Sequence, residues 1–187
     1  MITAVPPTEF WSRIQTVRER LADSDADAAV WFDATSIEYV TGFQHIQTER
    51  PVALALTDDR ISITVPRLEV ERVGQNDRIE AVYSYFDSPG GEPIATIAEM
   101  LDQMGVEAVL ADMDGAPGVM GYDGPALSEF VDVETQGWVP EMREAKTDAE
   151  VELVRESAKW ANLGHRHLTD FTEVGAHPAT VSPRASS

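Results

Sequence analysis

The feature that most limits how this chain can fold is a series of short apolar runs that alternate with helical patterns. Residues 28–32 and 106–111 are two such runs, each typical of a strand that is covered on both faces. An amphipathic helical pattern precedes each run, at residues 8–22 and at residues 94–104, where Gly105 ends it. Strands that alternate with helices predict an α/β fold, a sheet flanked by helices on both faces.

A hairpin makes the predicted sheet mixed rather than wholly parallel. Residues 52–56 and 61–65 are apolar and flank a turn at Asp58 and Asp59. Thr35 or Ser36 can cap a short helix that ends at Gly42. Shorter elements are expected as helices at residues 68–73 and 125–130, as strands at residues 79–85 and 131–133, and as a loop at residues 88–91.

The pattern changes near residue 140. We expect one domain at residues 1–140, and a linker helix with the start of a further domain at residues 141–174. Thr147 and Glu150 have the spacing of a capping box at the start of that helix. Residues 175–187 hold two prolines, three serines and no apolar periodicity, which predicts a disordered tail.

The charge balance excludes several classes of protein. The 14 Lys and Arg stand against 33 Asp and Glu, a formal charge of −19, so no phosphate backbone would be bound. Excess carboxylate with only two Lys (Lys146 and Lys159) predicts adaptation to concentrated salt. No apolar run could span a membrane and no signal peptide is recognisable, so we expect a cytoplasmic protein without a membrane partner.

No complete catalytic or metal-binding set is found in the sequence. Asp112 and Asp114 follow an apolar strand, as in haloacid-dehalogenase-like Mg²⁺ phosphatases, but the later residues that this chemistry needs are absent. His165 and His167 are two apart on a predicted helix, so they point in different directions and cannot share a metal ion. The chain has no Cys, hence no thiolate site.

Two segments resemble the creatinase/prolidase/aminopeptidase P family. The stretch Ser-Ile-Glu-Tyr-Val-Thr-Gly-Phe at residues 36–43, followed by Arg50 and Pro51, is similar to the family's Asn-Ile-x-Tyr-Leu-Thr-Gly-Phe … Arg-Pro. Residues 142–158 resemble the family's linker, Arg-x-x-Lys-Ser-x-x-Glu-Ile-x-x-Met-Arg-x-Ala. The resemblance covers about residues 10–175 and includes the spacing between the two segments.

The resemblance implies the N-terminal domain of an Xaa-Pro peptidase, which is not the chemical domain. In the family, a following pita-bread domain holds two divalent metal ions (Mn, Co or Zn) on two Asp, one His and two Glu. We expect this chain to stop where that domain begins, and to be inactive alone, with no catalytic residue and no metal or cofactor of its own.

The resemblance further implies a homodimer in which the loop from Phe43 to Arg50 reaches a partner subunit's substrate pocket. Candidate pocket residues are Arg50, His45 and Phe43. Arg50 could hold a substrate carboxylate or simply pair with Glu49 or Asp59.

Several alternatives stay open on the sequence alone. The chain could be a free-standing protein-binding module of the same fold, or the phosphatase that would use Asp112 and Asp114. Within the family, the substrate could be an Xaa-Pro peptide, a creatine-like or an ectoine-like compound.

Overall fold

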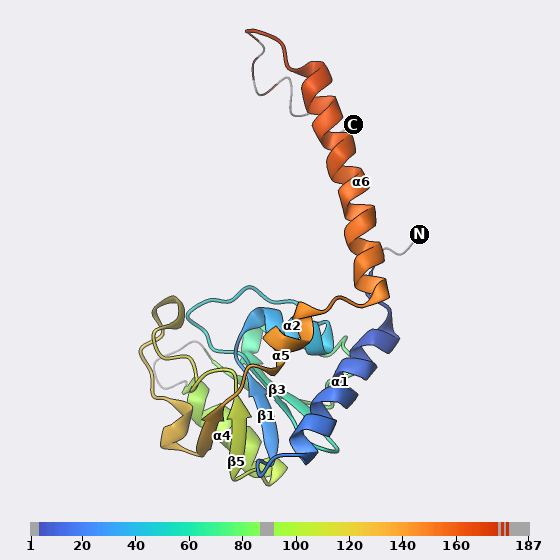
Figure 1. Cartoon of the computed structure of the whole chain (residues 1–187). Helices are drawn as coiled ribbons and strands as arrows, with labels where there is room; N and C mark the ends of the chain where they lie inside the picture. Colours follow the sequence, from blue (N-terminus) through green and yellow to red (C-terminus); the bar gives the residue numbers. More distant parts are fainter. Residues whose placement is uncertain (1–3, 87–91, 176, 178, 180–187) are drawn as a thin grey trace. The chain divides into compact units, whose positions relative to one another are not determined.

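The computed structural model of the chain describes residues 4–86, 92–175, 177 and 179. Strands and helices alternate along the chain as the sequence predicts (Figure 1). The strands are β1 (Ala28–Trp31), β2 (Ala53–Leu56), β3 (Ile61–Pro66), β4 (Ala81–Tyr85), β5 (Ala108–Ala111) and β6 (Asp132–Thr135). The α-helices are α1 (Pro7–Ala22), α2 (Ala34–Thr41), α3 (Val70–Val73), α4 (Pro93–Met104), α5 (Trp138–Glu144) and α6 (Asp148–Phe171). Three short 3₁₀ helices are η1 (Arg67–Glu69), η2 (Val119–Gly121) and η3 (Leu127–Glu129).

The six strands form one mixed sheet in the order β4-β3-β2-β1-β5-β6. β2 runs antiparallel to both of its neighbours, and the other three pairs are parallel. The predicted hairpin is the β2–β3 pair, in which Leu56 lies opposite Ile61. The mixed sheet expected from the sequence is therefore confirmed.

Helices cover both faces of the sheet, because successive strand residues point to opposite sides. In β1, Ala29 and Trp31 pack on the face that α1, α2 and α5 cover, whereas Ala28 and Val30 face α4. Complete burial of a large side chain such as Trp31, which has 0% exposure, contributes about 2–3 kcal/mol. The helix-flanked α/β arrangement is thus confirmed, with a separate apolar layer on each face.

Two local predictions need correction. Asp33, not Thr35 or Ser36, caps α2: its Oδ2 accepts the backbone N–H of Ser36 at 2.8 Å. The reason is that β1 ends before Asp33 and leaves this residue in an extended conformation, as a cap requires. At residues 125–130 only three residues are helical, and they form the 3₁₀ helix η3.

Helix α5 has no counterpart among the predicted elements. Its seven residues include Pro140 and follow Gly137, so local propensity gives no helical signal. Val139 is fully buried against the face that α1 and α2 cover, and Tyr39 Oη lies 3.3 Å from the carbonyl oxygen of Met142. Tertiary contacts therefore stabilise this helix.

The chain divides into two units, one of which is residues 8–144 with the whole sheet. The other contains α6, whose predicted capping box is present: Thr147 Oγ1 accepts the N–H of Glu150, and Glu150 Oε2 accepts that of Thr147. Apart from Gly175, His177 and Ala179, the expected disordered tail lies outside the described residues, as does the expected loop at residues 88–91. Among the described residues, no helix has the length and apolar character that a membrane span requires.

Candidate functional site

One edge of the sheet gathers the segments of interest. β1, β3, β4, β5 and β6 all run in the same direction, so their carboxyl ends lie at this edge. β2 runs the opposite way and begins there, which brings residues 43–52, the segment before it, to the same edge. Open α/β sheets bind their ligands outside the carboxyl ends of the strands, so this edge is the first place to look for a site.

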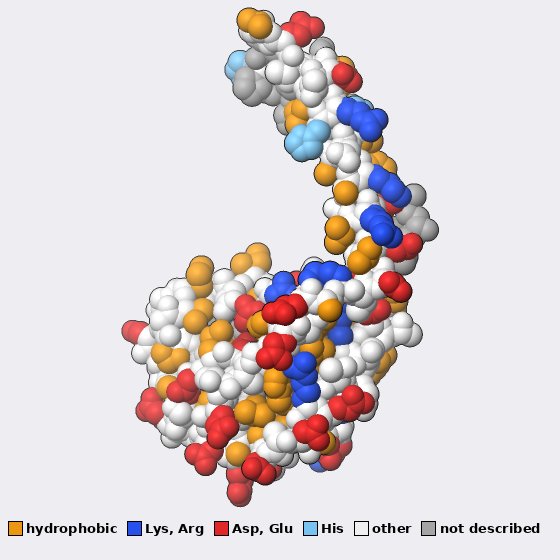
Figure 2. All heavy atoms as spheres, in the orientation of Figure 1, with side chains coloured by type: hydrophobic (Ala, Val, Ile, Leu, Met, Phe, Trp, Pro, Cys, Tyr) orange, Lys and Arg blue, Asp and Glu red, His pale blue; other side chains and the backbone are white. Residues whose placement is uncertain are grey.

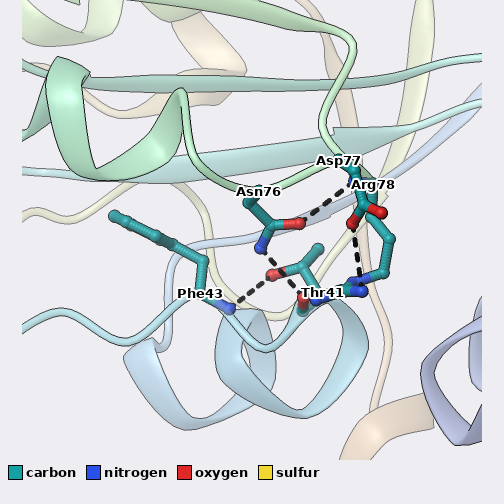
Figure 3. Close-up of polar contacts among 5 residues, drawn as sticks. All are labelled: Thr41, Phe43, Asn76, Asp77 and Arg78. Carbon is teal, nitrogen blue, oxygen red and sulfur yellow. Dashed lines mark hydrogen bonds and ion pairs between the residues drawn. The ribbon is translucent and has the colours of Figure 1, made fainter. Parts of the chain in front are cut away.

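The end of α2 fixes where segment 43–52 starts. Two side-chain donors meet the carbonyl oxygen of Thr41, Arg78 Nε at 2.7 Å and Asn76 Nδ2 at 3.0 Å. Thr41 Oγ1 in turn accepts the backbone N–H of Phe43 at 3.1 Å (Figure 3). Gly42 ends the helix in the left-handed region, with φ of 75°. The Thr-Gly-Phe stretch is thus a helix end, and it directs the chain into the segment.

Phe43 and His45 form the inner part of the segment. Phe43 is 5% exposed and belongs to the core, and the ring of His45 stacks on it at 5.7 Å between centroids. Burial lowers the pKa of His45 from its ordinary value, because the charged imidazolium loses its hydration. Among the described residues no partner lies within hydrogen-bonding distance of the buried His45 Nδ1. His45 is therefore a neutral, mostly packed ring near neutral pH.

The outer part of the segment presents Ile46 and Arg50. Ile46 is 85% exposed, an unusual position for a large aliphatic side chain. Arg50 donates its backbone N–H to Thr48 Oγ1 at 3.2 Å, and its Nε lies 3.8 Å from Glu49 Oε1. An exposed ion pair of this length contributes little to stability.

The segment is held at its far end as well. Tyr85 Oη, from the edge strand β4, donates to the carbonyl oxygen of Pro51 at 2.8 Å. Within the segment, Gln47 Oε1 accepts the N–H of Ala34 at 3.4 Å, which ties it to the start of α2. Sequence reasoning singled out Phe43, His45 and Arg50 but missed Ile46, although a lone aliphatic residue among polar ones is a usable signal.

Asp112 and Asp114 have separate structural partners at this edge. Asp112 Oδ1 and Oδ2 accept the backbone N–H groups of Phe32 and Asp33 at 2.9 and 3.0 Å, which ties β5 to the start of α2. Burial raises the pKa of Asp112 to about 6, against the opposing effect of these two hydrogen bonds. Asp114 accepts the N–H and Oγ–H of Ser128 at 2.7 and 2.6 Å. Both carboxylates thus accept hydrogen bonds that hold the fold together, and the phosphatase alternative, which would use them as nucleophile and acid/base, is not favoured.

Metal-ligating side chains are scattered over the described part of the chain. Nowhere in it do three His, Asp or Glu gather in a way that could hold a metal ion. His167 packs edge-on against Phe171 within α6, at 6.1 Å between ring centroids. The fold and its edge thus define an α/β domain in which a loop at the carboxyl edge is held by hydrogen bonds at both ends.

Comparison with known proteins identifies the family. Residues 13–145 match the model of the Creatinase/Prolidase N-terminal domain, and the chain belongs to this family. An uncharacterized peptidase of Staphylococcus haemolyticus is 24% identical over 165 residues, which are 88% of this chain and 45% of that protein.

Solved structures agree with this assignment. An Xaa-Pro dipeptidase from Bacillus anthracis matches with a TM-score of 0.69 and 19% identity, over 94% of this chain and 47% of that one. A proline dipeptidase structure from Streptococcus agalactiae matches with a TM-score of 0.53 and 26% identity, over 73% of this chain and 99% of that one. The chain spans about half the length of the Staphylococcus and Bacillus proteins. With the family shown, the alternative of a free-standing binding module is not favoured.

Proposed function

We propose that this chain is the non-catalytic N-terminal domain of an Xaa-Pro dipeptidase-like metallopeptidase, and that segment 43–52 completes the substrate pocket of a partner subunit. The observation that carries the proposal is the family match over residues 13–145, joined to a segment that is anchored at both ends and exposed in the middle. Such a segment can present side chains to another surface without having to become ordered first.

The residues of the segment divide into two roles. Phe43 and His45 position it: Phe43 is part of the core, and His45 stacks on Phe43 as a neutral ring. Arg50 is the group that meets substrate, because its side chain is 39% exposed and it lies in the outer part of the segment. Its planar guanidinium suits the free carboxylate of an Xaa-Pro dipeptide, which it can bind with two parallel hydrogen bonds.

The hydrolytic chemistry belongs to the catalytic domain of a full-length enzyme. Two divalent metal ions (Mn, Co or Zn) would be held there, and they would supply the activated water that attacks the peptide carbonyl. The described residues of this chain bring together no ligand set of that kind. This chain's contribution is therefore to bind and orient the substrate from the partner subunit and to take part in dimer formation.

Domain exchange tests the proposal. Residues 1–144 of this chain would replace the corresponding domain of the Bacillus anthracis Xaa-Pro dipeptidase, and Mn²⁺-dependent hydrolysis of an Xaa-Pro dipeptide would be measured. We expect Arg50→Ala to raise KM about tenfold with little change in kcat, as for a lost charge-assisted hydrogen bond.

Arg60→Ala is the matched control. Arg60 also neighbours an acidic residue, with its Nε 3.5 Å from Asp59 Oδ2, but it sits on the β2–β3 turn at the opposite edge of the sheet. Equal kinetic effects of the two substitutions, or none from Arg50→Ala, would contradict the role given to Arg50.

A further inference from the structure

We propose that Tyr85 is a positioning residue for the candidate site: its hydroxyl group holds the end of segment 43–52 and thereby places Arg50 for the substrate. This inference rests on the proposed function and adds a residue that acts on Arg50 from another strand. Tyr85 is the last residue of β4 and lies 34 residues after Pro51, to which it is bonded.

The hydrogen-bond pattern of the β2–β3 hairpin shows which residues should be paired where segment 43–52 enters β2. In an antiparallel ladder every second pair of opposite residues exchanges hydrogen bonds. Thr57 donates its N–H to the carbonyl oxygen of Arg60 across the hairpin, so the pair of Ala53 with Thr64 is also of the bonded kind. The next bonded pair, two residues further on, would join residue 51 to residue 66.

Both residues of that pair are prolines, and proline has no N–H group. Pro66 therefore cannot donate to the carbonyl oxygen of Pro51, although Pro51 is buried. Buried carbonyl groups are nearly always hydrogen-bonded. Tyr85 supplies the missing donor, because β4 pairs with β3 and brings Tyr85 beside Pro66. Its Oη, in a side chain that is itself buried, donates to the Pro51 carbonyl at 2.8 Å.

Holding Pro51 also holds the backbone of Arg50. The residue before a proline is restricted to extended conformations, so Arg50 has little freedom once Pro51 is fixed. On its other side, Arg50 donates its N–H to Thr48 Oγ1 at 3.2 Å. The backbone of Arg50 is thus held on both sides, while its side chain remains 39% exposed. A group placed in advance binds its ligand without an ordering cost.

The charge of the domain makes the placement of Arg50 important. Residues 8–144 carry nine Arg, no Lys and 27 Asp or Glu, a formal charge of −18. Acidic side chains are spread over the face of this unit that Figure 2 shows. Four more acidic residues follow strands at the carboxyl edge, Asp33, Asp112, Asp114 and Asp123. A substrate carboxylate is repelled by such a surface, so its binding depends on short-range contact with a guanidinium at a fixed position.

Kinetics of the domain-exchanged enzyme test the proposal. We expect Tyr85→Phe, which removes only the hydroxyl group, to raise KM about threefold with little change in kcat. In the Arg50→Ala background the same substitution should raise KM no further, because a positioning residue acts through Arg50. Tyr83→Phe is the matched control: Tyr83 lies on the same strand, and its Oη bonds Gln103 Oε1 of α4 at 3.0 Å.

A second substitution tests the bond itself. Pro66→Ala places an N–H group opposite Pro51, where the ladder lacks one. In the Tyr85→Phe background it should bring KM back to within about twofold of the wild-type value. A general loss of packing at Tyr85 would not be recovered in this way.

A spectroscopic readout on the 187-residue chain separates this inference from the proposed function. Because the chain has no Cys, Glu49→Cys accepts a single nitroxide label next to Arg50. We expect Tyr85→Phe to increase the mobility of the label in the electron paramagnetic resonance spectrum, and Tyr83→Phe to leave it unchanged. Circular dichroism would confirm that each variant is folded.

Four results would overturn the inference. They are an unchanged label mobility in Tyr85→Phe, equal effects of Tyr83→Phe and Tyr85→Phe, a further rise in KM when Tyr85→Phe is added to Arg50→Ala, and no recovery with Pro66→Ala. A wild-type KM in Arg50→Ala would instead contradict the proposed function, and the label would still decide whether Tyr85 holds the segment.

Discussion

At the scale of single residues, Gly42 determines how the chain leaves α2 and enters segment 43–52. Its φ is 75°, and a Cβ there would lie 3.0 Å from Phe10 Cζ. Gly105 ends α4 with nearly the same φ, 74°, but a Cβ there would meet nothing within 4 Å. Gly105→Ala should therefore cost about 1–2 kcal/mol of unfolding free energy for backbone strain alone, and Gly42→Ala clearly more.

Urea unfolding of the two glycine variants measures this difference. Both substitutions introduce the same backbone strain, because the two glycines have nearly the same φ. The difference between the two losses of unfolding free energy therefore measures the steric contact with Phe10. Equal losses would mean that Phe10 moves aside at no cost.

The buried carboxyl of Asp112 makes stability depend on pH. Its pKa is raised to about 6 in the folded protein, so folding binds a proton that the unfolded chain has released. The contribution of Asp112 to the unfolding free energy is fully present below the ordinary carboxyl pKa and is lost as the pH rises through 6. Between pH 5 and pH 7.5 the wild type should lose about 1 kcal/mol through Asp112.

Asp112→Asn isolates that contribution. The variant loses one of the two backbone hydrogen bonds to Phe32 and Asp33, but its stability no longer depends on this titration. Urea unfolding measures how much less stable the variant is than the wild type at each pH. This difference in unfolding free energy should be about 1 kcal/mol smaller at pH 7.5 than at pH 5. A constant deficit would show that Asp112 is already ionised at pH 5.

At the scale of elements, α6 differs from the other long helices because none of its 24 residues is buried. Its first turn therefore depends on local interactions, chiefly the reciprocal bonds between Thr147 and Glu150. Thr147→Ala should weaken the start of the helix by about 1 kcal/mol, which corresponds to about fivefold faster amide exchange in that turn. Ser157→Ala, at an exposed position within the same helix, serves as the control and should not accelerate exchange.

Most elements were predictable because their signals are local. The apolar periodicity of α1 and α4, the Gly105 end of α4 and the capping box of α6 all lie within a few residues of the feature they determine. Helix α5 was missed because its stability comes from Val139 in the distant core. The cap of α2 was assigned to the wrong residue because the end of β1, which sets it, is decided by pairing with β2 and β5.

At the scale of the whole molecule, the formal charge of −19 should make stability depend on salt. Repulsion among the carboxylates opposes the compact state in dilute buffer, and molar KCl screens it. The melting temperature in 2 M KCl should exceed that in dilute buffer by about 3 °C or more, equivalent to about 1 kcal/mol for a chain of this size. Equal midpoints in a calorimetric scan would contradict the proposed adaptation to concentrated salt.

The sequence predicts where the candidate site lies but not how its residues are arranged. The family motif at residues 36–43 and Arg50 indicate segment 43–52, and its role as a site stays a prediction. It could not show that Phe43 is part of the core, that His45 is packed on Phe43, or that Ile46 is the most exposed side chain of the segment. Those facts depend on Arg78, Asn76 and Tyr85, which lie 30 residues or more from the residues they bond.

The sequence by itself determined the α/β class, the mixed sheet, most helices and the family, because periodicity, caps and motifs act over short stretches of chain. Only the tertiary structure decided which segments share the carboxyl edge, since that depends on strand order and direction rather than on any local pattern. It also decided the roles of individual residues there. Burial and two backbone hydrogen bonds make Asp112 a structural acceptor, and the fold leaves Ile46 85% exposed.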